Sequence, residues 1–522
     1  MAATISVGYQ NSFILIIMCF FPALYLFSRL FKKPKDGSDL PPSPPSLPII
    51  GHLHLLLSTL IHKSLQRISN KYGPLLHLRV FNYAILLVSC PSVLYEIFKA
   101  HDVNISSRGL PPIEESLFFG SFSYFMAPYG DYWKFMKKLV ATKLIAPQTQ
   151  EQSRSDRAVE IERFYANLLD KARKKESVDI FQEAKGLVRN IIFKISLGRS
   201  CVEDNNEAER VVKLSNEMAA LSKKLFLAQI LNKPLEKLGI SLFRKEIMAV
   251  SDKVDELLES IVVERKEKLD EHQCKDLMDT FLAAYRDENA EYKINMNHIK
   301  AFFAELFTGT IDSTSTTIQW AMAEILNSPN TLERLREEIE SVVGRTRMIQ
   351  ETDLPKLPFL DAVVKEVLRL HAHGPLSVRK FQEGCKIRGF YIPENTTLVV
   401  NAYAIMRDPN YWEDPDEFKP ERFLDSLRPL PAEEARREQA LKYIPFGTGR
   451  RACPGGNLAS IFVRTAVGVM VQCFDWEIKG EKINMEEAAG RIFLNMAHPL
   501  KCTPSPRFLI HSLPFNLQTP TP

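Results

Sequence analysis

A ten-residue segment near the C-terminus constrains this chain more than any other feature of its sequence. The segment reads Phe-Gly-Thr-Gly-Arg-Arg-Ala-Cys-Pro-Gly, and five of its positions fall on the spacing F-x-x-G-x-R-x-C-x-G: Phe446, Gly449, Arg451, Cys453 and Gly455. The two spaced glycines let the backbone turn tightly and pass close to the sulfur, so that amide N–H groups can point at a thiolate. The spacing therefore predicts a loop that holds a metal-binding or reactive cysteine.

The residues around Cys453 add expectations about its chemistry. A soft thiolate suits iron, and thiolate ligation of haem iron favours cleavage of the O–O bond. An apolar helix is predicted over 458–474, and its positive N-terminal end is expected to lower the pKa of the thiol. We expect Phe446 to shield the sulfur and Arg451 to meet an acidic group on the bound ligand.

Other chemistry for the cysteines has little support. The eight cysteines are scattered over 522 residues, which argues against a disulfide scaffold, and no C-x-x-C pair or H-E-x-x-H motif points to zinc. Gly447, Gly449 and Ala452 also match a G-x-G-x-x-A dinucleotide fingerprint. We reject that match because Cys-Pro-Gly-Gly stands where the phosphate-binding helix should already be running.

The N-terminus predicts attachment to a membrane. The stretch 13–31 is almost wholly apolar and long enough to span a bilayer, and Lys and Arg residues cluster at its end. We predict a membrane anchor over 1–35, with the rest of the chain in the cytosol because basic residues favour the cytosolic side. A cleaved signal peptide is the disfavoured alternative, since no charge precedes the stretch and no small-residue cleavage site follows it.

Closely spaced prolines mark the next boundary. They predict a stiff extended hinge over 36–51, for which a disordered spacer is the alternative. The formal net charge of the whole chain is only +4 and no basic block occurs, so we expect no binding to nucleic acid.

The main body predicts a mainly α protein with a small β region. Apolar residues recur at helical spacing over seven segments: 153–172, 210–226, 243–269, 297–326, 330–343, 360–370 and 458–474. Short strands are predicted at four places: 75–80, 84–88, 386–392 and 397–401. The charged stretch 425–439 predicts a surface insertion, and residues 513–522 a disordered tail.

The spacing around Cys453 resembles the haem-binding loop of the cytochrome P-450 monooxygenases. The resemblance implies the cytochrome P-450 fold over 52–512, with haem b (iron protoporphyrin IX) bound axially by the Cys453 thiolate. It also implies single-pass attachment to the endoplasmic reticulum membrane behind an N-terminal transmembrane helix. Electrons would come from NADPH through a membrane-bound NADPH-cytochrome reductase, so NADPH itself would not bind this chain.

Further motifs fit the same family. Glu366 and Arg369 lie three apart on one predicted helix, where an acid and a base can pair. The segment Lys-Pro-Glu-Arg-Phe resembles the family's P-E-R-F element, so Arg422 is expected to join them in a buried network that braces the cysteine loop.

Three residues are expected to seat the haem propionates. The segment Tyr-Trp-Lys-Phe-Met-Lys resembles the family's W-x-x-x-R helix and places Trp133 and Lys137 one turn apart, with lysine where arginine is usual. Arg379, ten residues after Arg369, matches another propionate-binding position of the family. Without Cys453, ordinary packing or solvation would explain each of these residues.

The predicted helix over 297–326 resembles the one that crosses the oxygen-binding face of the haem. Gly309 and Thr310 stand on the family's A/G-G pair, Asp312 on its acid and Ser313 on its oxygen-activating threonine. An acid beside an alcohol can relay protons through water, so Asp312 and Ser313 are the expected catalytic residues. The structural alternative is that the Ser313 hydroxyl donates a hydrogen bond to a carbonyl of its own helix, as we expect for Ser315 and its neighbours.

The substrate is expected to be small and apolar. Five apolar segments are candidate substrate contacts: 110–125, 219–231, 304–309, 374–378 and 491–496. The single residues expected on the substrate side are Thr308, Gly309, Thr310 and Leu376. The hinge and several other segments resemble the plant-specific clan of the family, and most of all its crucifer group associated with triterpene alcohols.

Several alternatives stay open for function. A flavonoid or phenylpropanoid hydroxylase would use the same residue types, because core packing and either pocket draw on the same apolar side chains. A haem-thiolate isomerase or dehydratase that does not activate dioxygen would explain the unusual Thr310 and Ser313. A membrane-anchored scaffold without a cofactor is the remaining alternative.

Overall fold

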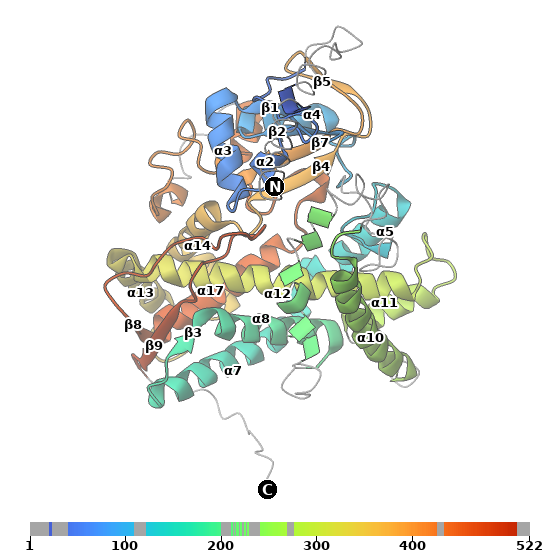
Figure 1. The fold of residues 1–522 in the computed structure, drawn as a ribbon. Coiled ribbons are helices and arrows are strands. Elements are labelled where there is room, and N and C mark those ends of the chain that lie inside the picture. The colour runs from blue at the N-terminus through green and yellow to red at the C-terminus, as the bar shows by residue number, and fades with distance from the viewer. Residues whose placement is uncertain are drawn as a thin grey trace, which may run out of the picture.

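The computed structural model describes most of the chain. The described residues are 20–22, 40–108, 122–199, 241–268, 276–424 and 433–508, with scattered helical positions between 210 and 228. A sheet region with α3 and α4 lies at one end of a larger body of helices, and α12 runs through the middle of that body (Figure 1). The prediction of a mainly α architecture with small sheets is confirmed.

The helical body is formed by long helices whose apolar faces meet α12. Its members include α7 (Arg154–Arg173), α8 (Ile180–Leu197), α10 (Arg244–Lys268), α11 (Leu277–Arg286), α12 (Met296–Leu326), α13 (Pro329–Val343), α14 (Pro358–His371) and α17 (Gly456–Cys473). Around α12 the core is aromatic and aliphatic, with Phe303 and Trp320 fully buried. Burial of that apolar surface, rather than helix propensity, stabilises such helices.

The smaller part of the protein is built on a four-stranded sheet of order β1-β2-β7-β4. Its strands are β1 (Leu75–Val80), β2 (Tyr83–Val88), β7 (Thr397–Asn401) and β4 (Leu376–Lys380). β2 and β7 pair in parallel, with Ile85 opposite Thr397, and β4 runs antiparallel to β7. The helices α3 (Ile61–Tyr72) and α4 (Pro91–His101) pack near this sheet. The pairing brings β4 beside the cysteine loop from far along the chain.

Two further sheets and several short elements complete the fold. β3 (Val178–Asp179), β9 (Lys501–Pro506) and β8 (Phe474–Ile478) form one sheet, and β5 (Cys385–Ile387) pairs with β6 (Phe390–Ile392). The short helices are α2 (Leu53–Leu56), α5 (Asp131–Val140), the π-helix η2 (Ala141–Ile145), α6 (Pro147–Gln152), η3 (Glu351–Lys356), α15 (Ala402–Ile405), η4 (Pro420–Phe423), α16 (Glu433–Ala440) and η5 (Gly449–Arg451).

The described part of the proline-rich segment lies against the first sheet. The Pro42 carbonyl accepts a hydrogen bond from the His77 N–H at 2.9 Å, and Pro44 is buried. Gly51 adopts a φ of +62°, and a side chain there would place its Cβ 2.1 Å from the Arg79 carbonyl oxygen. Glycine is therefore required at 51 for the segment to meet β1.

The elements differ from the predictions at identifiable places. The strand predicted over 386–392 is a hairpin, because Arg388 and Gly389 take positive φ values and turn the chain. The largely buried helix α8 was not predicted, although Asp179 caps its first turn by accepting hydrogen bonds from the Phe181 and Gln182 N–H groups.

The predicted membrane anchor lies outside the described residues except for 20–22, which are helical. Among the described helices, Gly456–Cys473 is the one that is long and apolar enough to cross a bilayer. That helix is 67% buried inside the protein, so its apolar character is explained by the core. The predicted tail over 513–522 and residues 425–432 of the predicted insertion also lie outside the described residues.

Candidate functional site

The cysteine loop is a tight turn followed by η5 in front of α17. The Cys453 N–H donates to the Phe446 carbonyl at 2.8 Å, which closes the loop on itself. Gly449 has a φ of +71°, and a Cβ at this position would lie 2.3 Å from the Phe98 ring. Gly455 has neither constraint, because its φ is −83° and an added Cβ would meet nothing within 4 Å. The two motif glycines therefore differ in how strictly they are required.

The sulfur of Cys453 opens onto a cavity beneath α12. Burial raises the pKa of the Cys453 thiol, and the Gly455 N–H and the Arg108 guanidinium offset this only in part. The predicted lowering of this pKa is wrong for the protein alone, since desolvation of the thiolate outweighs the amide and the helix terminus. A bound metal cation would supply the missing stabilisation of the thiolate.

The cavity has a volume of about 410 Å³, within the range of roughly 300–1,000 Å³ usual for small-molecule sites. It lies between the cysteine loop, α12 and the chain around β4. Most of the predicted site residues line it: Phe446, Arg451, Cys453, Gly455, Arg379, Gly309, Thr310, Ser313 and Leu376. Trp133, Lys137, Thr308, Asp312 and Gly449 do not line it.

Three arginines meet at one side of the cavity. Arg108 and Arg379 each donate to the Arg451 carbonyl, at 3.5 and 3.2 Å. Burial, together with its two neighbours Arg379 and Arg451, lowers the pKa of Arg108 to about 9. Like charges this close disfavour one another, so the cluster fits an anionic ligand. Sequence reasoning missed Arg108, which has no motif around it.

Arg451 lines the cavity, but its guanidinium is bound to the backbone on two sides. It is buried, its Nε donates to the Ser106 carbonyl at 2.6 Å, and a terminal nitrogen donates to the Ala127 carbonyl. Burial lowers its pKa to about 10. Its contact with an acidic group on the ligand stays a prediction, and two of its five N–H donors already bind the backbone.

Trp133 and Lys137 contact the cysteine loop through Arg451 and Arg450. The Arg451 guanidinium lies 4.4 Å from the centre of the Trp133 ring, and Trp133 is buried. Lys137 Nζ donates to the Arg450 carbonyl at 2.9 Å. Burial, followed by repulsion from Arg450, lowers the pKa of Lys137. Direct contact of either residue with a propionate stays a prediction.

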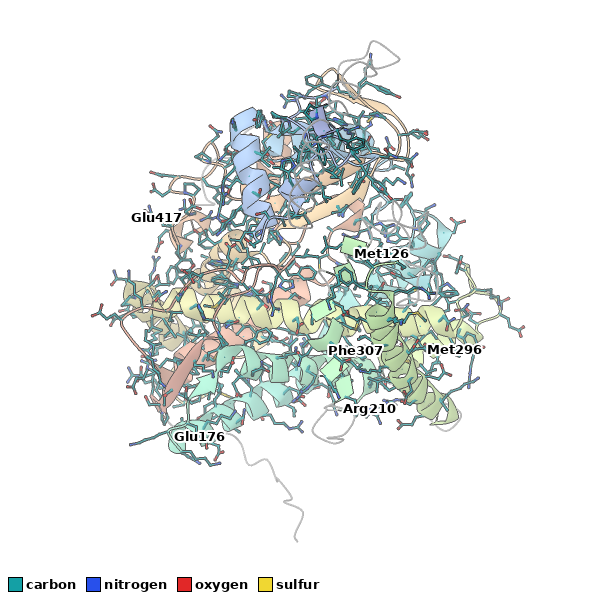
Figure 2. The ribbon with its side chains drawn as sticks, viewed as in Figure 1. Met126, Glu176, Arg210, Met296, Phe307 and Glu417 are labelled. Atoms are coloured by element: carbon teal, nitrogen blue, oxygen red, sulfur yellow. The ribbon has the colours of Figure 1, made fainter. Side chains whose placement is uncertain are left out.

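Glu366, Arg369 and Arg422 come together in the buried core near α14. Glu366 pairs with Arg369 at 2.7 Å and with Arg422 at 2.9 Å, and both Glu366 and Arg369 are 0% exposed. Arg369 also donates to the carbonyls of Met406, Pro415 and Glu417. Glu417 lies beside the helical body in Figure 2. The network therefore holds the segment that leads toward the cysteine loop.

The opposite wall of the cavity is α12. Ser313 Oγ donates back to the Gly309 carbonyl at 2.7 Å, so its hydroxyl hydrogen is used within the helix. Ser315, Thr317 and Thr308 also bond back to carbonyls four residues earlier. Thr314 differs, because it lines the cavity at 2% exposure and its Oγ1 has no hydrogen-bond partner among the described residues. Its hydroxyl is therefore available to a bound molecule.

Asp312 points toward α8 rather than into the cavity. Its Oδ1 lies 2.7 Å from Lys185 Nζ, and the Lys185 side chain is 4% exposed. Lys185 Nζ also donates to the Asn216 amide oxygen at 2.7 Å. A proton relay from Asp312 to Ser313 stays a prediction. In this geometry, the Asp312 carboxylate would have to break its pairing with Lys185 before it could take part.

A second carboxyl on α12 was missed by sequence reasoning. Glu305 lines the cavity one turn before Gly309 and accepts hydrogen bonds from Ser123 Oγ and from the Phe125 N–H at 3.1 Å. Burial raises the pKa of Glu305 to about 7, against the lowering effects of these donors and of Arg108. These bonds attach the segment around 123–126 to α12. Figure 2 shows Met126 of this segment near α12.

Comparison with known families decides what this site is. The model of the cytochrome P-450 family matches residues 41–503. The chain belongs to the cytochrome P-450 family. It is 62% identical over 510 residues to cytochrome P-450 705A22 of Arabidopsis thaliana, a match that covers 97% of this chain and 99% of that relative. The resemblance to the crucifer group is thus confirmed.

More distant cytochrome P-450 relatives carry names that state a reaction. A 3,9-dihydroxypterocarpan 6A-monooxygenase of Glycine max is 37% identical over 92% of this chain and 96% of its own length. A beta-amyrin 24-hydroxylase of Glycine max is 35% identical over 95% of this chain and 98% of its own length. A zebrafish cytochrome P-450 solved with progesterone has a TM-score of 0.72 at 25% identity, and the match covers 85% of this chain and 99% of that one.

The chain is accordingly a cytochrome P-450 monooxygenase, with haem bound through a cysteine thiolate and a reductase partner for its electrons. The described residues fit that cofactor. Cys453 opens onto the cavity, Gly449 lets the loop pass closely under Phe98, and three arginines face a place where anionic carboxylates would lie. The haem, when bound, supplies the activation of dioxygen.

Proposed function

We propose that this monooxygenase hydroxylates an apolar plant secondary metabolite, and that the metabolite is a triterpenoid. The apolar cavity wall carries the proposal: Phe302, Leu306, Leu376, Val400 and Val463 line the cavity onto which Cys453 opens. The named activity of the beta-amyrin relative supports a polycyclic terpenoid skeleton, and the zebrafish structure supports a fold that accommodates a steroid.

A flavonoid-type substrate is the second candidate. The pterocarpan monooxygenase is as similar to this chain as the beta-amyrin hydroxylase, at 37% against 35% identity. Apolar side chains alone do not separate a flat phenolic skeleton from a triterpenoid one, so both classes belong in the assay.

Within the site, the Cys453 thiolate would hold the iron of haem b, with Phe446, Gly449 and Gly455 shaping its loop. Arg108, Arg379 and Arg451 would hold the propionates, while Trp133 and Lys137 support them from behind. Ser313 and Thr314 would supply hydroxyls for proton delivery on the α12 side of the cavity, and Asp312 would supply them with protons if its pairing with Lys185 opened. Glu305 is the other acid that faces the cavity.

We infer that the enzyme works at the endoplasmic reticulum membrane. The apolar stretch 13–31 and the basic residues after it would anchor the chain by one span, with the catalytic domain in the cytosol. Electrons would come from NADPH through a membrane-bound NADPH-cytochrome reductase.

The experiment is turnover of the full-length chain in membranes with a plant reductase, NADPH and two substrate panels, one of triterpenoids and one of flavonoids. A reduced carbon monoxide difference spectrum first establishes haem–thiolate loading. We expect NADPH-dependent hydroxylation of a triterpenoid. Conversion of flavonoids alone would favour the second candidate, and conversion of a substrate without NADPH or dioxygen would favour an isomerase or dehydratase.

A further inference from the structure

One histidine lies in the wall of the cavity without a role in the cysteine loop. His373 follows α14, just before β4, and lines the cavity. Its Nδ1 is shielded from solvent and has no hydrogen-bond partner within the described parts of the chain. Leaving a buried polar atom unpaired is unfavourable, so such an atom in a cavity wall points to a ligand.

The imidazole ring is held in place by packing. It stacks on the Phe493 ring, with centroids 4.7 Å apart and planes inclined by 10°. The His373 carbonyl accepts a hydrogen bond from the Leu494 N–H at 2.9 Å, which joins the backbone of the two segments. A fixed ring orientation with a free nitrogen is the arrangement that recognises one polar group at one place.

The ring is neutral at physiological pH. Burial lowers the pKa of His373 to about 4, while Asp312 raises it and Arg491 lowers it by smaller amounts. A neutral imidazole has one N–H donor and one lone-pair acceptor. A hydroxyl can pair with Nδ1 in either tautomer, since its oxygen accepts from an N–H and its hydrogen donates to a lone pair.

Leu376, Val400 and Ala402 line the same cavity on or beside β4 and β7, with Ser377 as a polar residue of β4. We propose that His373 binds a hydroxyl group of an otherwise apolar substrate and thereby sets which carbon lies over Cys453. The inference rests on the proposed function and narrows it: the substrate is an alcohol or phenol rather than a hydrocarbon. The reaction that supplies the substrate of this enzyme must therefore leave a free hydroxyl on it.

The test compares matched ligands in matched variants of the full-length, haem-loaded enzyme. The ligands are pairs of triterpenoids and flavonoids, each as the free hydroxyl compound and as its O-methyl or deoxy analogue, with affinity measured by equilibrium dialysis. His373→Phe keeps a ring to stack on Phe493 but removes both nitrogens, and His373→Gln keeps a donor and an acceptor. Leu376→Ala is the control that removes apolar contact alone.

We expect the wild type to bind at least one hydroxyl compound roughly 3- to 15-fold more tightly than its blocked partner, the value of one hydrogen bond. His373→Phe should abolish that preference, His373→Gln should keep part of it, and Leu376→Ala should weaken both members of a pair equally. No preference in the wild type for any pair overturns the proposal. So does a preference that survives in His373→Phe, or an equal loss for both members of a pair in that variant.

These readouts separate the inference from the proposed function. Haem loading and NADPH-dependent hydroxylation are measured independently of the ratio of the two affinities. A preference for hydroxyl compounds that depends on His373 but comes without oxygenation would leave the inference standing and overturn the proposed function. Oxygenation with no such preference would do the reverse.

Discussion

The two walls of the cavity are built on opposite principles. Around and behind the cysteine loop, the charged groups are paired: Glu366 binds two arginines, Arg369 donates to three carbonyls, and Arg451 donates to two. On α12 and on the segment before β4, Thr314 and His373 have unpaired polar atoms among the described residues, and Glu305 on α12 is a buried acid with a raised pKa. A rigid wall suits a permanent cofactor, while groups left unpaired suit molecules that bind and leave.

The largest expected effect comes from disrupting the charge network behind the cysteine loop. Glu366→Ala should strand Arg369 and Arg422 without their partner, at a cost of about 3–5 kcal/mol. We expect protein without bound haem, seen as loss of the Soret band and of the reduced carbon monoxide spectrum. Glu421→Ala, which removes an exposed pair with Arg334, should change stability by less than about 1 kcal/mol. Normal haem loading in Glu366→Ala would contradict the bracing role.

The next effect tests the buried acid on the α12 side. Because the pKa of Glu305 is raised to about 7, the fold prefers the neutral carboxyl, and stability should fall as the pH rises from about 4.5 through 7. A rise from the ordinary value of 4.5 corresponds to roughly 3 kcal/mol at most. Glu305→Gln should flatten the pH dependence of unfolding between pH 5 and 8. An unchanged slope would show that Glu305 ionises freely.

A comparison within the cysteine loop comes third. Gly449→Ala should lose about 2 kcal/mol or more, because the positive φ is unfavourable for alanine and its Cβ would meet Phe98. Gly455→Ala should lose less than about 1 kcal/mol, since its backbone is ordinary and space is free. Haem retention during thermal unfolding measures both. Equal effects of the two substitutions would contradict the assigned difference.

The smallest effect on stability concerns the hydroxyls of α12. Thr314→Val should leave stability unchanged or raise it by about 1 kcal/mol, because it removes a buried hydroxyl without a partner. If this hydroxyl also hands protons to dioxygen, the product formed per NADPH should fall about tenfold or more, and further than in Ser313→Ala. A larger loss of coupling in Ser313→Ala would return the role to the position that the family motif indicates.

The sequence predicted the local features of this protein, but it did not predict contacts between residues that are distant in the chain. The helices over 297–326 and 360–370 were predicted almost to the residue, because apolar periodicity is local. The same reasoning placed Asp312 in the relay, whereas α8 brings Lys185 against it. Arg108, Glu305 and His373 had no motif, since only the packing of α12 against the loop and β4 makes them neighbours.

The sequence by itself determined the family, the cysteine ligand and the mostly helical architecture. Spacing in one short loop and the 3.6-residue period of helices are written in consecutive residues, and no tertiary contact is needed to read them. Only the tertiary structure decided which polar groups are paired and which are left for a ligand. Pairing between distant segments depends on atoms brought within about 3 Å of one another. The fold places Lys185 against Asp312, whereas it leaves the Thr314 hydroxyl and the His373 Nδ1 without a partner among the described residues.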